Sequence, residues 1–245
     1  MKFRLIIHGH RNAYENMAID EALLLSGKPT LRFYKWKPSA ISIGYFQSIK
    51  NEVNLELCER QGVDVVRRIT GGGAVYHDSE GEITYSFVCP QHFMPEKILE
   101  SYKIICGALA HGLKKIGLEA EQAGINDIVV DGKKISGSAQ TRKYGNILQH
   151  GTLLLQVNVR KMFSLLKVSK EKISDKNIKS IEERVTSIEK EIGKISDEEV
   201  IKALIEGFKE NLSIEFKEEG IGEEEIEIAR KLVKKYESKE WNFKR

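Results

Sequence analysis

Three consecutive glycines, Gly71 to Gly73, constrain this chain more than any other feature of its sequence. Glycine loses more backbone entropy on folding than other residues, so a run of three is costly. Such a run is expected where the backbone approaches a ligand closely or needs positive φ angles. It follows "VDVVRRI" and precedes "EITYSFVC", in which alternation predicts a half-buried strand with one face made by Ile83, Tyr85, Phe87 and Cys89.

The rest of the chain mixes strand and helix patterns. Strands are expected at residues 30–36, 39–46, 82–89 and 147–157, and helices at 16–25, 95–116 and about 223–236. Ser196 and Glu199 form a capping box that opens another helix. Asp131-Gly132, between two apolar stretches, predicts a tight hairpin. We therefore expect an α+β fold, with a mixed, largely antiparallel sheet and flanking helices.

Composition excludes several classes of protein. With 245 residues, 41% of them hydrophobic, the chain is not disordered. No apolar run approaches the roughly 18 residues of a membrane helix, and the N-terminus does not resemble a secretory signal. A net charge of +3 from 39 basic and 36 acidic residues does not suggest nucleic-acid binding. Three cysteines without CxxC spacing argue against a disulfide framework and suggest a reducing cytoplasm.

The glycine run is also the first candidate site, because Arg67 and Arg68 precede it. Guanidinium groups match phosphate and carboxylate oxygens, and backbone N–H groups beside them could form an anion cradle. Neither a P-loop nor a GxGxxG motif is present. The ordinary alternative is a flexible loop beside a basic pair.

The second candidate follows the hairpin at Asp131-Gly132. Lys133 and Lys134 should point to opposite faces of one strand, so that one can point inward. The small residues after them leave room for a bulky ligand, and an inward lysine would stabilise negative charge on a phosphoryl or acyl group. The alternative is a pair of surface lysines that protect an edge strand.

His150, between a glutamine and a glycine, could be a general base, a ligand contact or a buried core residue. Asn126-Asp127 is more often a turn than a metal site. There is no zinc-like cluster and no GxSxG motif, so nothing indicates a protein nucleophile.

Three motifs in order, "RRITGGGAVYHD", "NDIVVDGKKISGSAQ" and "LQHGTLLL", resemble those of lipoate–protein ligases. "MAIDEALL", "LRFYKW", "SIGYFQ" and "ERVTSI" also fit, so the resemblance covers nearly the whole chain. It implies a fold shared with biotin protein ligases and the class II aminoacyl-tRNA synthetase core.

The resemblance further implies a two-step reaction with ATP and Mg²⁺, in which lipoate becomes lipoyl-AMP and the lipoyl group then passes to a carrier lysine. Lys134 would be the catalytic residue, contacting the carbonyl and the α-phosphate, with Arg68 on the phosphate side. ATP and lipoyl-AMP would also lie against Gly71, Gly72, Gly73, Ala74, Val75 and Tyr76. Weaker assignments to the lipoate pocket are His77, Gly137, Ser138 and His150. Asp127 would contact a metal or the ribose.

By this resemblance residues 1–245 form a single catalytic domain, like the large subunit of a two-polypeptide ligase. The C-terminal accessory domain of longer ligases is absent from the chain, so we expect a small accessory subunit as partner. The expected acceptors are the lipoyl domains of 2-oxoacid dehydrogenases and the glycine-cleavage H protein.

Three alternatives remain. Related octanoyltransferases share these motifs but use carrier-protein thioesters and a cysteine nucleophile, which in one branch lies just before the lysine hairpin. Here that region, Gly124 to Asp127, has no cysteine, and Cys89 and Cys106 fit structural positions. We therefore expect an ATP-dependent ligase. A biotin ligase lacks support because its basic loop is missing, and the intact Lys134 argues against a non-catalytic binding module. The choice between lipoate and octanoate depends on the depth of the pocket.

Overall fold

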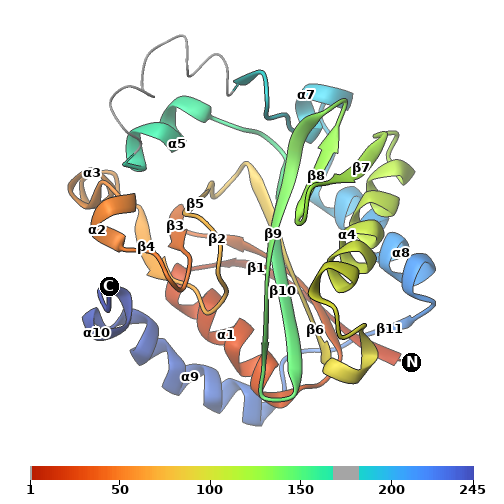
Figure 1. Ribbon diagram of the computed structural model, residues 1–245, viewed down its shortest axis with the longest axis horizontal. Helices are drawn as coiled ribbons and strands as arrows, with labels where there is room; N and C mark the ends of the chain where they lie inside the picture. The colour runs from red at the N-terminus through yellow and green to blue at the C-terminus, as the bar shows by residue number, and fades with distance from the viewer. Residues whose placement is uncertain (1, 168–181) are drawn as a thin grey trace.

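The computed structural model describes residues 2–167 and 182–245 (Figure 1). Within these residues the large sheet has eight strands, in the order β11 (Glu215–Glu218), β1 (Lys2–Arg11), β2 (Thr30–Trp36), β6 (Glu82–Pro90), β10 (Asn146–Leu154), β9 (Lys133–Lys143), β8 (Asp127–Val130) and β7 (Ala120–Ala123). β1 is parallel to β2 and β11, and all other neighbours are antiparallel. The small sheet has the order β4 (Asp64–Arg67), β3 (Ala40–Ile43) and β5 (Val75–His77).

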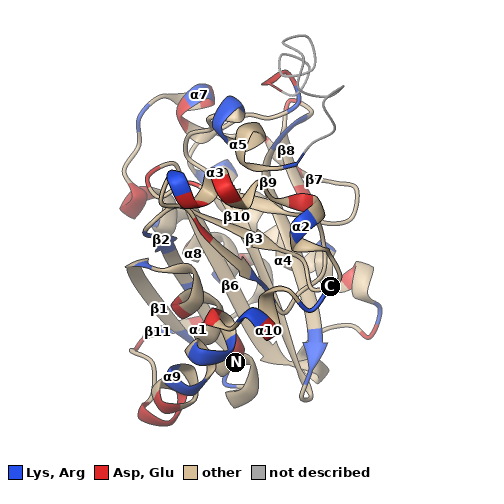
Figure 2. Cartoon of the chain, turned by 90° about the vertical axis from the view of Figure 1, so that its left-hand side faces the viewer, with Lys and Arg blue, Asp and Glu red and all other residues tan. Residues whose placement is uncertain are grey.

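Helices cover both faces of the large sheet. The helices among the described residues are α1 (Ala13–Ser26), α2 (Ile49–Glu52), α3 (Leu55–Arg60), the 3₁₀ turn η1 (Gln91–Phe93), α4 (Ile98–Lys115), α5 (Val159–Leu165), α7 (Ile188–Ile192), α8 (Asp197–Leu212), α9 (Glu223–Glu237) and α10 (Lys239–Asn242). α2, α3 and α5 pack on the small sheet. Figure 1 shows α4 and α8 on one side of the sheet, and α1, α9 and the small sheet on the other. Figure 2 shows the charged residues on these outer helices; in α9 the acidic residues lie in the first turn and lysines in the last.

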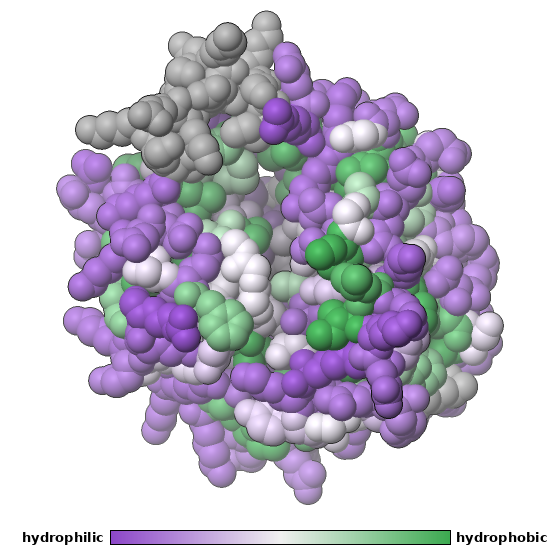
Figure 3. Space-filling view, viewed as in Figure 1, coloured by the Kyte–Doolittle hydropathy of each residue, from purple (hydrophilic) through white to green (hydrophobic). Residues whose placement is uncertain are grey.

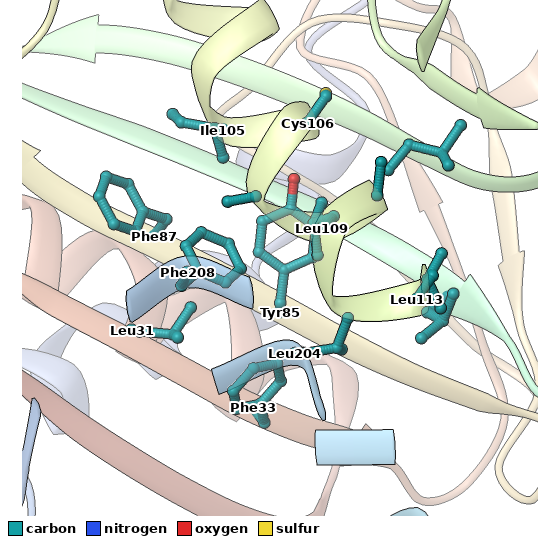
Figure 4. Packing of buried hydrophobic residues seen from close by; sticks show 14 of the residues in the cluster. Leu31, Phe33, Tyr85, Phe87, Ile105, Cys106, Leu109, Leu113, Leu204 and Phe208 are labelled. Carbon is teal, nitrogen blue, oxygen red and sulfur yellow. The ribbon is translucent and has the colours of Figure 1, made fainter. Parts of the chain in front are cut away.

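The apolar core lies between the large sheet and the pair α4 and α8 (Figure 4). Phe87 of β6 stacks on Phe208 of α8, with ring centroids 5.6 Å apart. Leu31, Phe33 and Tyr85 extend the same face and are buried, as are Ile105, Leu109 and Leu204 on the helices. Burying side chains of this size is the dominant stabilising contribution, about 1.5–3 kcal/mol each.

The opposite face of the same strands is polar and equally buried. Strand alternation turns Thr84 and Ser86 of β6 toward α1 and the small sheet, together with Arg32 of β2 and His150 of β10. Buried polar side chains need partners, so hydrogen bonds hold most of these side chains, beside apolar contacts that α1 makes with Val88 and Leu148 on the same face. The candidate site lies on this face.

The expected mixed α+β class is confirmed. The hairpin at Asp131-Gly132 is present, with φ angles of 48° and 72°, and Ser196 caps α8 with Glu199 as expected. α1 begins three residues before the predicted helix, because Asn12 and Glu15 form a capping box that the sequence analysis overlooked. The strand expected at 39–46 ends at Ile43. Among the described residues, no helix is both long and apolar enough to cross a bilayer.

Candidate active site

A cavity of about 340 Å³ lies between the small sheet and the polar face of the large sheet. Figure 3 shows this face of the molecule hollowed between the region of the small sheet and that of β8 and β9. One wall consists of the residues between β4 and β5, and the other of β6, β9 and β10. The sequence-predicted residues that line the cavity are Arg68, Gly72, Gly73, Ala74, Val75, Tyr76, His77, Lys134, Gly137, Ser138 and His150.

The glycine loop, residues 68–74, joins β4 to β5 and forms one wall of the cavity. Gly72 has a φ angle of 93°, which disfavours residues with a Cβ atom. The loop also packs tightly on Gly44, where an added Cβ would lie 1.9 Å from the carbonyl oxygen of Gly72. Backbone packing on backbone therefore explains part of the glycine requirement that the sequence analysis assigned to a ligand.

Arg67 and Arg68 do not extend into the cavity as free cations. Both are buried, and Arg67 donates to main-chain carbonyls, among them that of Gln47 at 2.6 Å. Nη2 of Arg68 donates to the carbonyls of Gly71 and Gly73, each at 2.7 Å, while Nε and Nη1 reach acceptors on neighbouring residues. Burial lowers the pKa of Arg68 to about 10, so it stays charged at neutral pH. Its position supports the loop; the expected contact with a phosphate stays a prediction.

Lys134 lies at the mouth of the cavity, with its side chain 43% exposed, and its Nζ is 2.7 Å from Oδ1 of Asp127. Its backbone pairs with the "ERVTSI" segment: Lys134 N donates to the carbonyl of Arg184, and Thr186 N donates to that of Lys134, each at 2.8 Å. These two bonds are separate from the β8–β9 pairing. They hold the backbone of Lys134 against the segment from Arg184 to Thr186.

Gly137 makes room for this lysine. An added Cβ at Gly137 would lie 2.7 Å from Nζ of Lys134, so the side chain crosses over the glycine. The small residues after the hairpin therefore accommodate the lysine itself as well as the cavity.

Asp127 is paired with Lys134, and the part of the chain that the structure describes contains no cluster of three or more histidine, cysteine or acidic side chains that could hold a metal ion. Its role toward a metal or ribose stays a prediction.

The two predicted histidines both lie in polar chains that the sequence analysis missed. His150 contacts Asp20 of α1 and Thr70 of the glycine loop, and His77 contacts Glu82 and Ser42. One signal was available: Asp20 lies in the apolar helix "MAIDEALLL", where a buried carboxylate needs a partner.

The three cysteines are buried, and none of them lines the cavity. Burial raises the pKa of Cys58 and Cys106 to about 11 and that of Cys89 to about 12, so all three are protonated at neutral pH. Cys106 lies on α4 in the apolar core (Figure 4). Because the thiolate is the nucleophile, the protonated and buried Cys89 and Cys106 fit the structural role expected of them.

Comparison with known proteins identifies the family to which this chain belongs. Residues 12–209 match the model of the lipoyl protein ligase A/B catalytic domain. The chain belongs to this family. It is 38% identical to an octanoyltransferase, LipM, of Brevibacillus brevis, and the match covers 100% of this chain and 99% of that protein. Further relatives that are 34–37% identical are also named octanoyltransferase LipM, including that of Bacillus subtilis.

Solved structures confirm the expected fold. A bi-partite lipoate protein ligase of Thermoplasma acidophilum is 36% identical, with a TM-score of 0.91, over 99% of this chain and 96% of that one. A lipoate-protein ligase A bound with ATP is 34% identical, with a TM-score of 0.86, over 99% of both chains. Biotin protein ligase of Aquifex aeolicus, 15% identical over 86% of this chain and 70% of that one with a TM-score of 0.52, shares the fold alone.

The expectation of an ATP-dependent ligase is wrong by this comparison, because the relatives found by sequence are named octanoyltransferases. That expectation gave decisive weight to the missing cysteine before the lysine hairpin. An amine can attack a thioester directly, so the lack of one nucleophile does not exclude acyl transfer. The chain is an enzyme of the lipoylation family, as expected.

Proposed function

We propose that this chain transfers an eight-carbon acyl group from a carrier-protein thioester to the ε-amine of a lysine on a lipoyl carrier domain. The observation that carries the proposal is a single cavity that joins a buried pocket to the ammonium of Lys134 at its mouth. The octanoyltransferase relatives support this choice of chemistry. A thioester is already activated, so the reaction requires no ATP.

The transfer needs positioning and charge stabilisation. The neutral amine of the acceptor lysine attacks the thioester carbonyl carbon, a C–N bond forms, and the carbonyl oxygen becomes an oxyanion. When this intermediate collapses, the C–S bond breaks, and the departing sulfur takes up the proton that the nitrogen loses. Lys134 is placed to stabilise the oxyanion, a contribution that is commonly worth about 10²–10³ in rate.

The remaining expected residues are assigned to the acyl group in this proposal. Ala74, Val75 and Tyr76 would contact the acyl chain, with Gly72 and Gly73 presenting backbone to it. The acceptors would be the lipoyl domains of 2-oxoacid dehydrogenases and the H protein. Residues 1–245 would act as one catalytic domain. The accessory subunit and the cytoplasmic location stay predictions.

The test is reconstitution from purified components. The chain is incubated with octanoyl-acyl-carrier protein and a lipoyl domain without nucleotide, and the modified lysine is identified by mass spectrometry. Parallel reactions supply free octanoate or lipoate, each with and without ATP and Mg²⁺. Adding a candidate accessory subunit tests the predicted partner.

We expect octanoylation from the thioester without ATP. Modification that requires both a free acid and ATP, with no transfer from the thioester, would overturn the proposal. Repeating the reaction with a lipoyl domain whose acceptor lysine is replaced by arginine controls for non-enzymatic acylation.

A further inference from the structure

Arg68 receives two buried chains of hydrogen bonds, each with a carboxylate, a histidine and a hydroxyl. In the first, Nδ1 of His150 lies 2.9 Å from Oδ2 of Asp20, and Nε2 lies 2.7 Å from the hydroxyl of Thr70. Nε of Arg68 donates to that same hydroxyl at 3.1 Å. The chain therefore runs from α1 through β10 to the glycine loop.

The second chain runs through the small sheet. Nδ1 of His77 lies 2.8 Å from Oε1 of Glu82, and Nε2 lies 2.8 Å from the hydroxyl of Ser42. Nη1 of Arg68 donates to this hydroxyl at 3.2 Å and to the carbonyl of Ser42 at 2.9 Å. All these residues are less than 9% exposed, so solvent does not replace the bonds.

The direction of the first chain follows from charge. Burial lowers the pKa of His150, so the ring is neutral at neutral pH, and the carboxylate of Asp20 can only accept from it. Nδ1 therefore carries the proton, and Nε2 accepts from Thr70. The Thr70 hydroxyl points its hydrogen at His150 and keeps a lone pair for Arg68.

Arg68 connects these two hydrogen-bonded chains to the backbone of the glycine loop. Three of its five N–H groups face the two hydroxyls and the Ser42 carbonyl, and the other two donate to the carbonyls of Gly71 and Gly73. Since glycines hold no fixed conformation of their own, these two bonds set the loop that lines the cavity.

Each chain has the residue types of a catalytic triad. Thr70, however, is fully buried and does not line the cavity, which excludes it as a nucleophile. Ser42 lines the cavity, but its hydroxyl oxygen and its carbonyl oxygen both accept from Nη1 of Arg68, so the hydroxyl is not free to attack a substrate.

We infer that Thr70, His150, Ser42 and His77 are positioning residues, which act through Arg68 to hold the glycine loop against the acyl chain. This inference rests on the proposed function only for the identity of that ligand.

The test compares Thr70→Val, Ser42→Ala and the double variant with wild type. The rate of hydrogen–deuterium exchange at residues 71–73 measures how firmly the loop is held without any ligand. Calorimetry with octanoate measures the affinity of the cavity for the acyl chain. Thr70→Ser keeps the hydroxyl and serves as the conservative rescue. Ser101→Ala is the matched control, since the buried Ser101 hydroxyl also accepts from an arginine, Nη2 of the partly buried Arg142 at 3.0 Å, outside the cavity.

We expect exchange in the loop to quicken, and octanoate binding to weaken, by about tenfold in Thr70→Val, with Thr70→Ser within about twofold of wild type. Because both hydroxyls act on one arginine, the double variant should deviate from additivity, whereas Ser101→Ala should lower only thermal stability.

Unchanged loop exchange in Thr70→Val and in Ser42→Ala would overturn the inference, as would additive effects in the double variant or an octanoyl ester trapped on Ser42. If wild type neither binds octanoate nor transfers octanoyl from the thioester but the exchange results hold, the proposed function fails and the positioning role stands.

Discussion

At the residue scale, the structure separates side chains that are exposed at the cavity, such as Lys134, from side chains that support its walls, such as Arg68. Residue type and spacing left Lys133 and Lys134 open and did not decide the role of His150; the resemblance to lipoate–protein ligases singled out Lys134. The same reasoning treated Arg68 as a ligand contact, because sequence does not show that its donors meet main-chain carbonyls. Asp20 was missed because its partner His150 is 130 positions away in the chain. Glu82 was missed although its partner His77 is only 5 positions away, because the strand pattern does not show that both side chains are buried.

Lys134 carries the clearest prediction about the reaction. Lys134→Ala should lower kcat/KM for octanoyl transfer by about 10²–10³, since it removes the charge beside the developing oxyanion. Lys133→Ala, the neighbouring lysine on the same hairpin, is the control and should leave kcat/KM within about twofold, because a surface charge there is screened by solvent. Equal losses in both variants would remove Lys134 from the mechanism.

The cysteines give a second prediction. Direct transfer requires no thiolate, so Cys106→Ala should keep kcat/KM within about threefold of wild type, even though a buried side chain is shortened and thermal stability falls. The measurement is transfer from octanoyl-carrier protein, together with a search for an acyl-enzyme by mass spectrometry. A thioester on Cys106 would contradict direct attack.

The lowered pKa values of two buried or half-buried histidines, His8 and His150, predict how the free energy of unfolding depends on pH. His8 accepts a bond from Nε of Arg32 at 3.0 Å, and burial, then Arg32 and Arg11, lower its pKa from 6.5 to about 3. Burial also lowers the pKa of His150. Between pH 6.5 and 3 the unfolded chain therefore binds more protons than the folded one, and the free energy of unfolding falls as pH decreases.

From pH 7 to pH 5 the expected loss is about 1–2 kcal/mol, measured by urea unfolding. His8→Asn, whose amide oxygen can replace Nδ1 as acceptor, should reduce this loss. His111→Asn, a substitution on an exposed part of α4, should leave it unchanged. A stability profile that is flat between pH 5 and 7 would contradict this account.

At the element scale, local signals located helices better than strands. The capping box of Ser196 fixed the start of α8, and the Asp131-Gly132 pair fixed the β8–β9 hairpin. β1 was not recognised, because "KFRLIIHGHR" shows neither clear alternation nor a bounding turn, and its identity as a strand depends on pairing with β2 and β11. The path of Lys134 likewise depends on the distant Arg184 to Thr186 segment.

Gly137 of β9 tests how this strand places its lysine. Gly137→Ala would put a methyl group 2.7 Å from Nζ of Lys134, so the flexible side chain must move away. We expect kcat to fall by about tenfold or more, because small misplacements of a catalytic group are costly. Thermal stability should change little, since the contact is the far end of a lysine. Wild-type kcat in this variant would show that Lys134 works from another position.

At the scale of the whole molecule, the sequence pattern predicted an α+β class but not the division into two sheets. Residues 39–46 and 63–69 look like any other strands, and only the pairing of β3 with both β4 and β5 creates the wall opposite β9 and β10. The structure adds that α8 covers the apolar core and α9 packs on α1, beside the buried polar face.

An ion pair between β1 and α9 gives the prediction for global stability. Nη1 and Nη2 of Arg4 lie 2.6 and 2.7 Å from the two carboxylate oxygens of Glu225, and both side chains are less than 9% exposed. Glu225→Gln leaves the arginine without its counter-charge, at an expected cost of about 3 kcal/mol in the free energy of unfolding. Glu227→Gln, whose exposed carboxylate pairs with Arg230 on the same helix, should cost about 0.5 kcal/mol or less.

The dependence on pH distinguishes lost charge from altered packing in that variant. Burial alone would raise the pKa of Glu225, but the bonds from Arg4, Ser26 and the backbone of Gly222 outweigh it and lower the pKa to about 2. The carboxylate therefore stabilises the fold fully above about pH 4.5 and loses this contribution as pH falls toward 2. Urea unfolding of both proteins should show their difference shrinking over that interval. A difference that stays constant would mean that packing, and not the ion pair, joins the first strand to the last long helix.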